Sequence, residues 1–144
     1  MLLGQYTHSI DDKNRISLPV RFREKMGKKV VVTPGLDHCL FVFSPKEWER
    51  ISARLAEVSL GQADNRGFSR FMFGQAAEAD IDSIGRILVP DGLVEWADLS
   101  GKVAVVGIQN RVEIWNEKAW TAYKNGVDSK AGALAEKLGQ VGVI

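Results

Sequence analysis

An aspartate and an arginine recur with the same spacing at two places in the chain. The first pair is Asp11 and Arg15, and the second is Asp82 and Arg86. Across a tight turn, a carboxylate can hold a guanidinium through a fork of hydrogen bonds. That pairing would act as a structural staple, or it would hold the arginine outward for a phosphate group or a base edge.

Basic residues crowd around the first of these motifs. Residues 13–29 contain one glutamate, Glu24, and seven basic side chains, a local charge of +6: Lys13, Arg15, Arg21, Arg23, Lys25, Lys28 and Lys29. Residues 1–72 hold 12 basic and 8 acidic side chains and residues 73–144 hold 7 and 10, so the formal net charge of +1 hides two unlike halves. A polyanionic partner would explain the basic run, although a solvated basic face is the simpler alternative.

The neighbours of the two motifs differ along the sequence. Lys13, Arg21 and Arg23 lie close to the first motif, whereas Asp80, Asp91 and Glu95 flank the second. This difference predicts that the first motif meets nucleic acid more directly. The second would be more structural or would contact a neighbouring subunit.

The chain repeats itself around these motifs. Residues 10–19 are echoed by residues 81–90, where Ile, Asp, Arg, Ile and Pro recur in the same places. Residues 39–43 followed by Trp48 are echoed by residues 111–115 followed by Trp120. Two ordered blocks at nearly the same offset indicate a duplicated unit of about 45 residues.

Alternating apolar and polar residues predict strands on both sides of each motif. Asn14 aligns with Gly85, and both residue types tolerate the positive φ that a tight turn needs. Pro19 and Pro90 should end strands and start short helical turns, the first of them running to Gly27. The predicted strands are 5–10, 15–18, 28–33 and 40–43 in the first copy, and 102–108 and 112–115 in the second.

Three helices are predicted from caps and apolar spacing. Ser44 begins a capping box before the apolar stripe Trp48, Ile51, Leu55 and Val58. Asp64 should cap a helix carrying Phe68, Phe71 and Met72 and ending near Gly74, and Asn116 one carrying Trp120 and Tyr123. The aromatic side chains are expected in the core, and a weak helix is expected over residues 131–138.

Composition excludes several classes of protein. The 144 residues, 45% hydrophobic and 26% charged, suit one globular domain or two very small ones. One cysteine, Cys39, and two histidines argue against disulfides and metal sites, and Cys39 is expected to be a buried, inert thiol. No phosphate-binding loop, catalytic constellation, signal peptide or membrane span is recognisable. We therefore expect a soluble cytoplasmic protein with no catalytic residues, cofactor, metal, small-molecule substrate or membrane partner.

The tandem Asp-x-x-x-Arg motifs, each followed by a proline and a valine-rich strand pair, resemble the bacterial MraZ family over residues 3–124, including the middle segment 66–75. These proteins are double-repeat relatives of the AbrB/SpoVT regulators. The resemblance implies a mostly β fold with flanking helices (α+β), a double-repeat swapped-hairpin β-barrel. Its predicted parts are repeats at 3–50 and 75–124, a connecting helical segment at 51–74 and a tail at 125–144.

The same resemblance implies a sequence-specific transcriptional regulator that binds double-stranded DNA. It would recognise short repeated boxes upstream of its own division and cell-wall gene cluster, as a ring-shaped homo-oligomer associated with the nucleoid. The predicted DNA-binding residues, with Asp11 and Asp82 as support, are Arg15, Lys13, Asn14, Arg21, Arg23 and Arg86. The alternative is a protein-interaction or antitoxin-like module, because fold alone does not determine function.

Overall fold

The computed structural model describes all 144 residues, Met1–Ile144. The strands are β1 (Leu2–Ser9), β2 (Arg15–Ser17), β3 (Lys29–Pro34), β4 (Leu40–Phe43), β5 (Ala77–Asp80), β6 (Arg86–Leu88), β7 (Lys102–Gln109) and β8 (Val112–Asn116). The helices are α1 (Val20–Met26), α2 (Pro45–Leu55), α3 (Ala63–Gly74), α4 (Asp91–Trp96), α5 (Glu117–Ser129) and α6 (Ala131–Gln140). The α+β class is confirmed, but the expected dominance of strands is wrong, since helices hold 41% of the chain and strands 29%.

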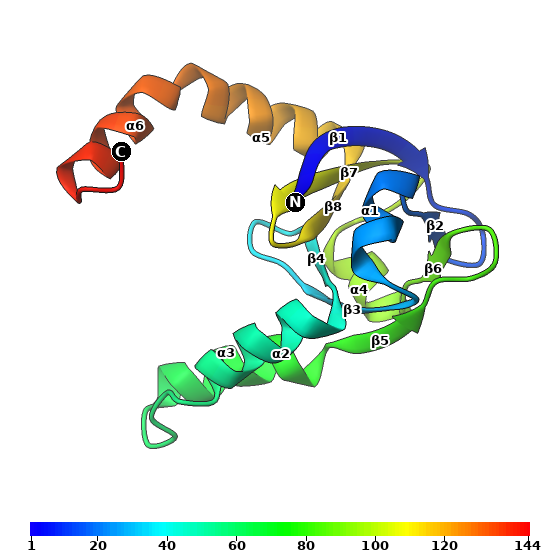
Figure 1. Ribbon diagram of the computed structural model, residues 1–144, viewed down its shortest axis with the longest axis horizontal. Helices are drawn as coiled ribbons and strands as arrows, with labels where there is room; N and C mark the ends of the chain where they lie inside the picture. Colours follow the sequence, from blue (N-terminus) through cyan, green and yellow to red (C-terminus); the bar gives the residue numbers. More distant parts are fainter.

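The strands of the two repeats are interleaved in one antiparallel sheet. Its order is β1-β7-β8-β4-β3-β5, and β2 and β6 form a separate two-stranded ribbon, here called the β2–β6 ribbon (Figure 1). Strands β1 to β4 of the first repeat correspond in order to β5 to β8 of the second. When each strand is replaced by its counterpart, the sheet order reads the same from either end. The first strand of each repeat therefore pairs with a strand of the other repeat.

This exchange also determines how the strands around each motif pair. The strands before and after the first turn share only the isolated bridge between Ile10 and Ile16. Instead, β2 pairs with β6, with Ile16 opposite Ile87 and Ser17 opposite Arg86. The strands on the two sides of each motif therefore do not form a simple hairpin, because each returning strand pairs with one from the other copy. The six-stranded sheet ends at β1 and β5, so its hydrogen bonding does not close into a barrel.

Equivalent positions of the two repeats build one core. Ile16 and Ile87 are fully buried, and Phe22 of α1 and Leu93 of α4 lie in the same 19-residue cluster. Since α1 and α4 follow the two ribbon strands directly, burial of their apolar faces fixes the position of the ribbon against the sheet.

The predicted turn chemistry is confirmed. Asn14 has φ 59° and Gly85 has φ 88°, both in the left-handed region. Pro19 and Pro90 immediately precede α1 and α4, and Gly27 ends α1 at φ 89°.

The helix predictions are partly right. The Ser44 hydroxyl accepts from the Glu47 N–H at 3.3 Å, and the Asn116 side chain accepts from the Ala119 N–H at 3.0 Å, so both caps are confirmed. Asp64 is not a cap, because α3 begins at Ala63 with Gln62 at the cap position, which puts Asp64 inside its first turn. Val58 lies beyond α2, which ends at Leu55.

The aromatic side chains expected in the core lie at its margin, and Trp120 packs against a small buried cluster. None of Trp48, Phe68, Phe71, Trp120 and Tyr123 is fully buried. The α2–α3 and α5–α6 segments project from the sheet as two arms (Figure 1), and α2, α5 and α6 contain no buried residue. None of the helices combines the length and the apolar composition that a membrane-spanning segment requires.

Candidate nucleic-acid interface

The two Asp-x-x-x-Arg turns have the same hydrogen-bond pattern. Asp11 Oδ1 accepts from the N–H groups of Lys13 (2.9 Å) and Arg15 (2.8 Å), while its Oδ2 accepts from Arg15 Nε (2.7 Å). Asp82 accepts in the same way from the N–H groups of Ile84 (3.1 Å) and Arg86 (2.8 Å), and from Arg86 Nε (2.8 Å). One carboxylate thus shapes each turn and orients its arginine.

These contacts favour the charged form of both aspartates. The backbone N–H of Arg15 is the largest cause that lowers the pKa of Asp11, and partial burial opposes it. The guanidinium of Arg15 and the Lys13 N–H lower this pKa further. The pKa of Asp82 is lowered by the equivalent groups, with the Arg86 N–H first.

Strand pairing brings the two arginines onto one ribbon. Arg15 lies opposite Leu88 and Arg86 opposite Ser17, and Arg86 Nη1 is 3.9 Å from Asp11 Oδ2. The side chains of Arg15 and Arg86 are 31% and 27% exposed. The terminal nitrogens of Arg15 make no hydrogen bond within the chain. Asp11 therefore holds Nε of Arg15 and leaves its terminal nitrogens without a partner in the chain, whereas Nη1 of Arg86 also faces Asp11.

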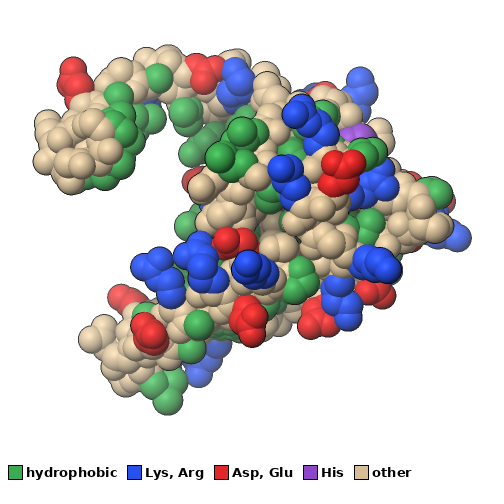
Figure 2. All heavy atoms as spheres, viewed as in Figure 1, with side chains coloured by type: hydrophobic (Ala, Val, Ile, Leu, Met, Phe, Trp, Pro, Cys, Tyr) green, Lys and Arg blue, Asp and Glu red, His purple; other side chains and the backbone are tan.

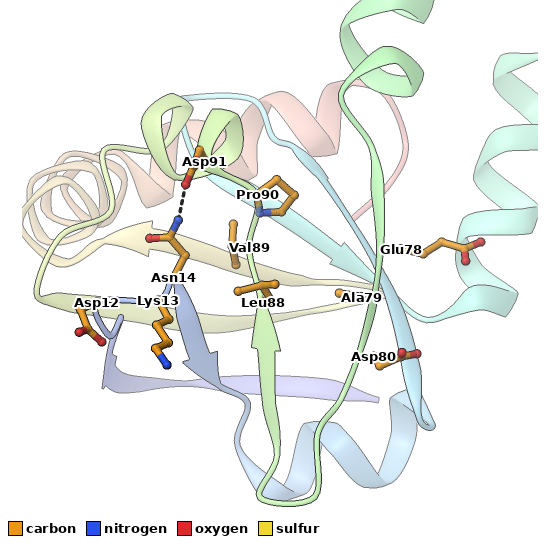
Figure 3. A pocket seen from close by; sticks show the side chains of 10 residues that line it. All are labelled: Asp12, Lys13, Asn14, Glu78, Ala79, Asp80, Leu88, Val89, Pro90 and Asp91. Atoms are coloured by element: carbon orange, nitrogen blue, oxygen red, sulfur yellow. Dashed lines mark hydrogen bonds between the residues drawn. The ribbon is translucent and has the colours of Figure 1, made fainter.

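The charged neighbours of the turns are exchanged between the repeats. Asn14 Nδ2 of the first turn donates to Asp91 Oδ1 at 2.6 Å, as Figure 3 shows. The guanidinium of Arg23 lies directly against Gly85 of the second turn. The expectation that Arg23 sits beside the first motif and Asp91 beside the second is wrong in space, since each side chain reaches across to the other repeat.

The other predicted DNA-binding residues are distributed over the first turn and α1. Lys13 and Arg21 are exposed, whereas Arg23 is half-buried and its Nε has no hydrogen-bond partner. Figure 2 shows Lys and Arg side chains gathered over α1 with few acidic ones among them. Beyond α1, Lys29 of β3 pairs with Glu78 at 3.5 Å. The basic run thus forms a surface next to the ribbon that is only partly neutralised.

The remaining chemically notable residues have structural surroundings. Cys39 is fully buried, as predicted, and burial raises the pKa of its thiol. Its Sγ donates to the Leu36 carbonyl at 3.2 Å. The His38 ring stacks on Trp96 with centroids 4.1 Å apart. No group of three or more His, Cys, Asp or Glu side chains is placed to hold a metal ion.

Comparison with known proteins agrees with the duplicated architecture. A family model described as "MraZ protein, putative antitoxin-like" matches the chain twice, over residues 1–71 and 72–137. A protein of Thermoanaerobacter sp. (strain X514), named "Transcriptional regulator MraZ", is 44% identical over 143 residues, covering 99% of this chain and all of its own. Relatives of the same name from Carboxydothermus hydrogenoformans and Acetivibrio thermocellus are 44% and 41% identical, covering 96% and 99% of this chain and 96% and 100% of their own. The chain belongs to the MraZ family.

Proposed function

We propose that this protein is a transcriptional regulator that binds double-stranded DNA sequence-specifically through the β2–β6 ribbon. The observation that carries the proposal is the placement of Arg15 and Arg86 on one ribbon, each held at Nε by its own aspartate, with Arg86 Nη1 also 3.9 Å from Asp11 Oδ2. A two-stranded ribbon is narrow enough to enter a major groove, where arginine is the commonest reader of guanine. The names of the relatives support the regulatory role.

Each residue of the surface has a distinct role in this proposal. Arg15 and Arg86 read base edges, while Lys13 and Arg21 contact phosphates and so position the ribbon. Asn14 and Arg23 hold the two turns in place through Asp91 and Gly85, and Arg23 adds positive potential. The sequence predicts a more direct role for the first motif, but the two turns have the same geometry and Arg23 lies against the second one, so we propose that both arginines contribute comparably.

A single ribbon offers too little surface for tight specific binding, so we propose that the protein acts as a ring-shaped homo-oligomer. Specific interfaces with DNA bury on the order of 1,000 Å² or more of protein surface. Exposed apolar side chains on α6, Leu134 and Leu138, support subunit contacts, because such patches are usually covered. Repeated boxes upstream of its own division and cell-wall gene cluster are the proposed target, which would place the protein on the nucleoid.

The proposal is tested by a gel shift on the chain's own upstream DNA with scrambled competitor. We expect Arg15→Ala and Arg86→Ala each to weaken specific binding by about 1–3 kcal/mol per ribbon. Arg15→Lys keeps the charge and should retain non-specific binding while losing discrimination. Arg54→Ala, an exposed arginine of α2, is the matched control and should leave binding unchanged.

Two results would contradict the proposal. One is a wild-type protein that does not prefer its upstream DNA over the scrambled competitor. The other is a loss for Arg54→Ala equal to that for the ribbon variants. Circular dichroism of every variant shows whether the fold is retained.

A further inference from the structure

Strand β5 is a free edge of the six-stranded sheet. Its register with β3 places Ala79 opposite Val30, and the Ile81 N–H donates to the Lys28 carbonyl at 2.9 Å. In an antiparallel pair, this pattern makes Ala79 the residue that exchanges backbone hydrogen bonds with β3. The N–H and C=O groups of Glu78 and Asp80 therefore point to the open side of the strand.

An open groove of about 810 Å³, here called the β5 groove, lies along this edge. Figure 3 shows that residues of β5 and β6 line it, with the turn carrying Asp12 and Lys13 on the far side of β6 from β5. Leu88 of β6 is 60% exposed and lines the groove. Because the Val89 N–H donates to the Asn14 carbonyl, the N–H and C=O groups of Leu88 point away from β2. The groove thus combines unpaired backbone groups with an apolar contact.

The β5 groove has a one-sided charge. Four carboxylates line it, against the single ammonium of Lys13: Asp12, Glu78, Asp80 and Asp91. Glu78 is partly neutralised by Lys29, and Asp91 is bonded to Asn14, but Asp12 and Asp80 take part in no ion pair. Like charges on facing strands are unfavourable, so this acidic edge opposes pairing with the β5 edge of another copy. A strand that carries positive charge is complementary to it.

We propose that the β5 groove binds an extended segment, rich in lysine or arginine, of a partner protein that adds to β5 as a new strand. Backbone hydrogen bonds to Glu78 and Asp80 would hold the segment. Alternate side chains would reach the carboxylates and Leu88, because successive residues of a strand point to opposite faces. The chain's own basic run is folded into β2, α1 and β3, so the segment belongs to a different protein. This proposal does not depend on the proposed recognition of DNA, but the groove shares Lys13 and Leu88 with the first turn and the ribbon, so DNA and the segment would compete for them.

The test uses the full chain, labelled with ¹⁵N, and a capped heptapeptide of alternating lysine and valine. We expect the peptide to shift the amide signals of Glu78, Asp80 and Leu88. A peptide with glutamate in place of lysine should not bind. A peptide N-methylated at alternate positions should bind much more weakly, because it lacks the donors that pair with the strand edge.

Variants separate the charge from the backbone contribution. Glu78→Gln with Asp80→Asn should weaken peptide binding about five- to tenfold, while the matched Glu117→Gln on α5 should not. Asp80→Pro removes an outward N–H that β3 does not use, and it should weaken binding more than Asp80→Asn. If Asp80→Pro does not fold, the N-methylated peptide makes the same comparison.

Several outcomes would overturn the proposal. They are equal binding of the basic and acidic peptides, no binding at millimolar peptide, and binding that leaves the Glu78 and Asp80 signals unmoved. Shifts of these signals that grow with protein concentration alone would assign the groove to a second copy of this chain. DNA binding by the same sample is measured in parallel, so a failure of this proposal is distinguishable from a failure of the proposed regulatory function.

Discussion

Asp11 and Asp82 each accept two backbone N–H bonds and one guanidinium N–H. A carboxylate with three such donors favours its charged form, and its pKa falls on folding. The same contacts restrict the rotation of Arg15 and Arg86. At the scale of single residues, the stability of each turn and the aim of its arginine therefore depend on one carboxylate.

This dependence predicts a pH effect on stability. Because folding lowers both pKa values, the pairs stabilise the fold fully above about pH 5. They lose this contribution as the pH falls through the usual aspartate value of about 3.9 and then through the lower values of the folded state. Asp11→Asn with Asp82→Asn should therefore flatten the acid limb of the free energy of unfolding, measured by urea titration. Parallel curves for the variant and the wild type would contradict this account.

The backbone conformation at position 85 also requires a particular residue type, glycine. Its φ of 88° disfavours any side chain, and a Cβ there would collide with the guanidinium of Arg23. Gly85→Ala should destabilise the protein by about 1–2 kcal/mol from the backbone alone, with a further cost for displacing Arg23. Gly67→Ala, in the open interior of α3, should instead stabilise it by about 0.5–1 kcal/mol.

Thermal unfolding of the two alanine variants checks this prediction. Adding Arg23→Ala to Gly85→Ala should recover the part of the loss that comes from the collision. If the double variant is as unstable as the sum of the single ones, Arg23 does not pack on this turn.

At the scale of elements, local patterns predicted the strands closely, because alternation, prolines and left-handed turn residues act within a few positions. The strand predicted over residues 40–43 matches β4, and Asn14 and Gly85 adopt the expected φ. The exchange of strands could not be predicted in this way. A strand such as β2 presents the same apolar face whether its partner is β1 or β6, so alternation does not distinguish the two pairings.

The misplaced neighbours of the candidate site follow from that exchange. Distance along the chain placed Arg23 beside Arg15, but Arg23 lies on Gly85, and Asp91 bonds to Asn14 of the first turn. The Asp–Arg pairs themselves were predictable, since both partners lie within one turn. Contacts that cross between the repeats depend on the strand pairing, and no pattern of neighbouring residues in the sequence predicts them.

The interleaving predicts that neither half folds alone as a monomer. Residues 1–71 without β6 and β7 would leave β1 and β2 unpaired and would expose the buried face around Ile16. We expect each half, produced separately, to lack the sheet signal in circular dichroism as a monomer, and equimolar mixing to restore it. A stable monomeric fold of residues 1–71 at sedimentation equilibrium would contradict the role of strand exchange.

At the scale of the whole molecule, the ribbon and the two arms lie on different parts of the surface (Figure 1). In this arrangement, contacts between subunits through an arm would leave the ribbon free. Figure 2 shows apolar side chains along the side of α6 that faces the body of the protein. An assembly through this surface would present several identical ribbons to one DNA molecule.

Assembly of this kind predicts that affinity depends on the number of boxes in the DNA. Once one ribbon is bound, the next binds at a high effective concentration, so two correctly spaced boxes should bind about 10²–10⁴ times more tightly than one. A monomer would gain only the statistical factor of about two expected for two independent sites.

Fluorescence anisotropy on DNA with one, two and three boxes, defined by footprinting, measures this ratio. The affinity should also fall more steeply with salt as boxes are added, because each neutralised phosphate adds about −0.9 to the slope of log affinity against log salt concentration. Equal affinity for one box and for two, in a protein that sediments as a monomer, would rule out recognition by an assembly.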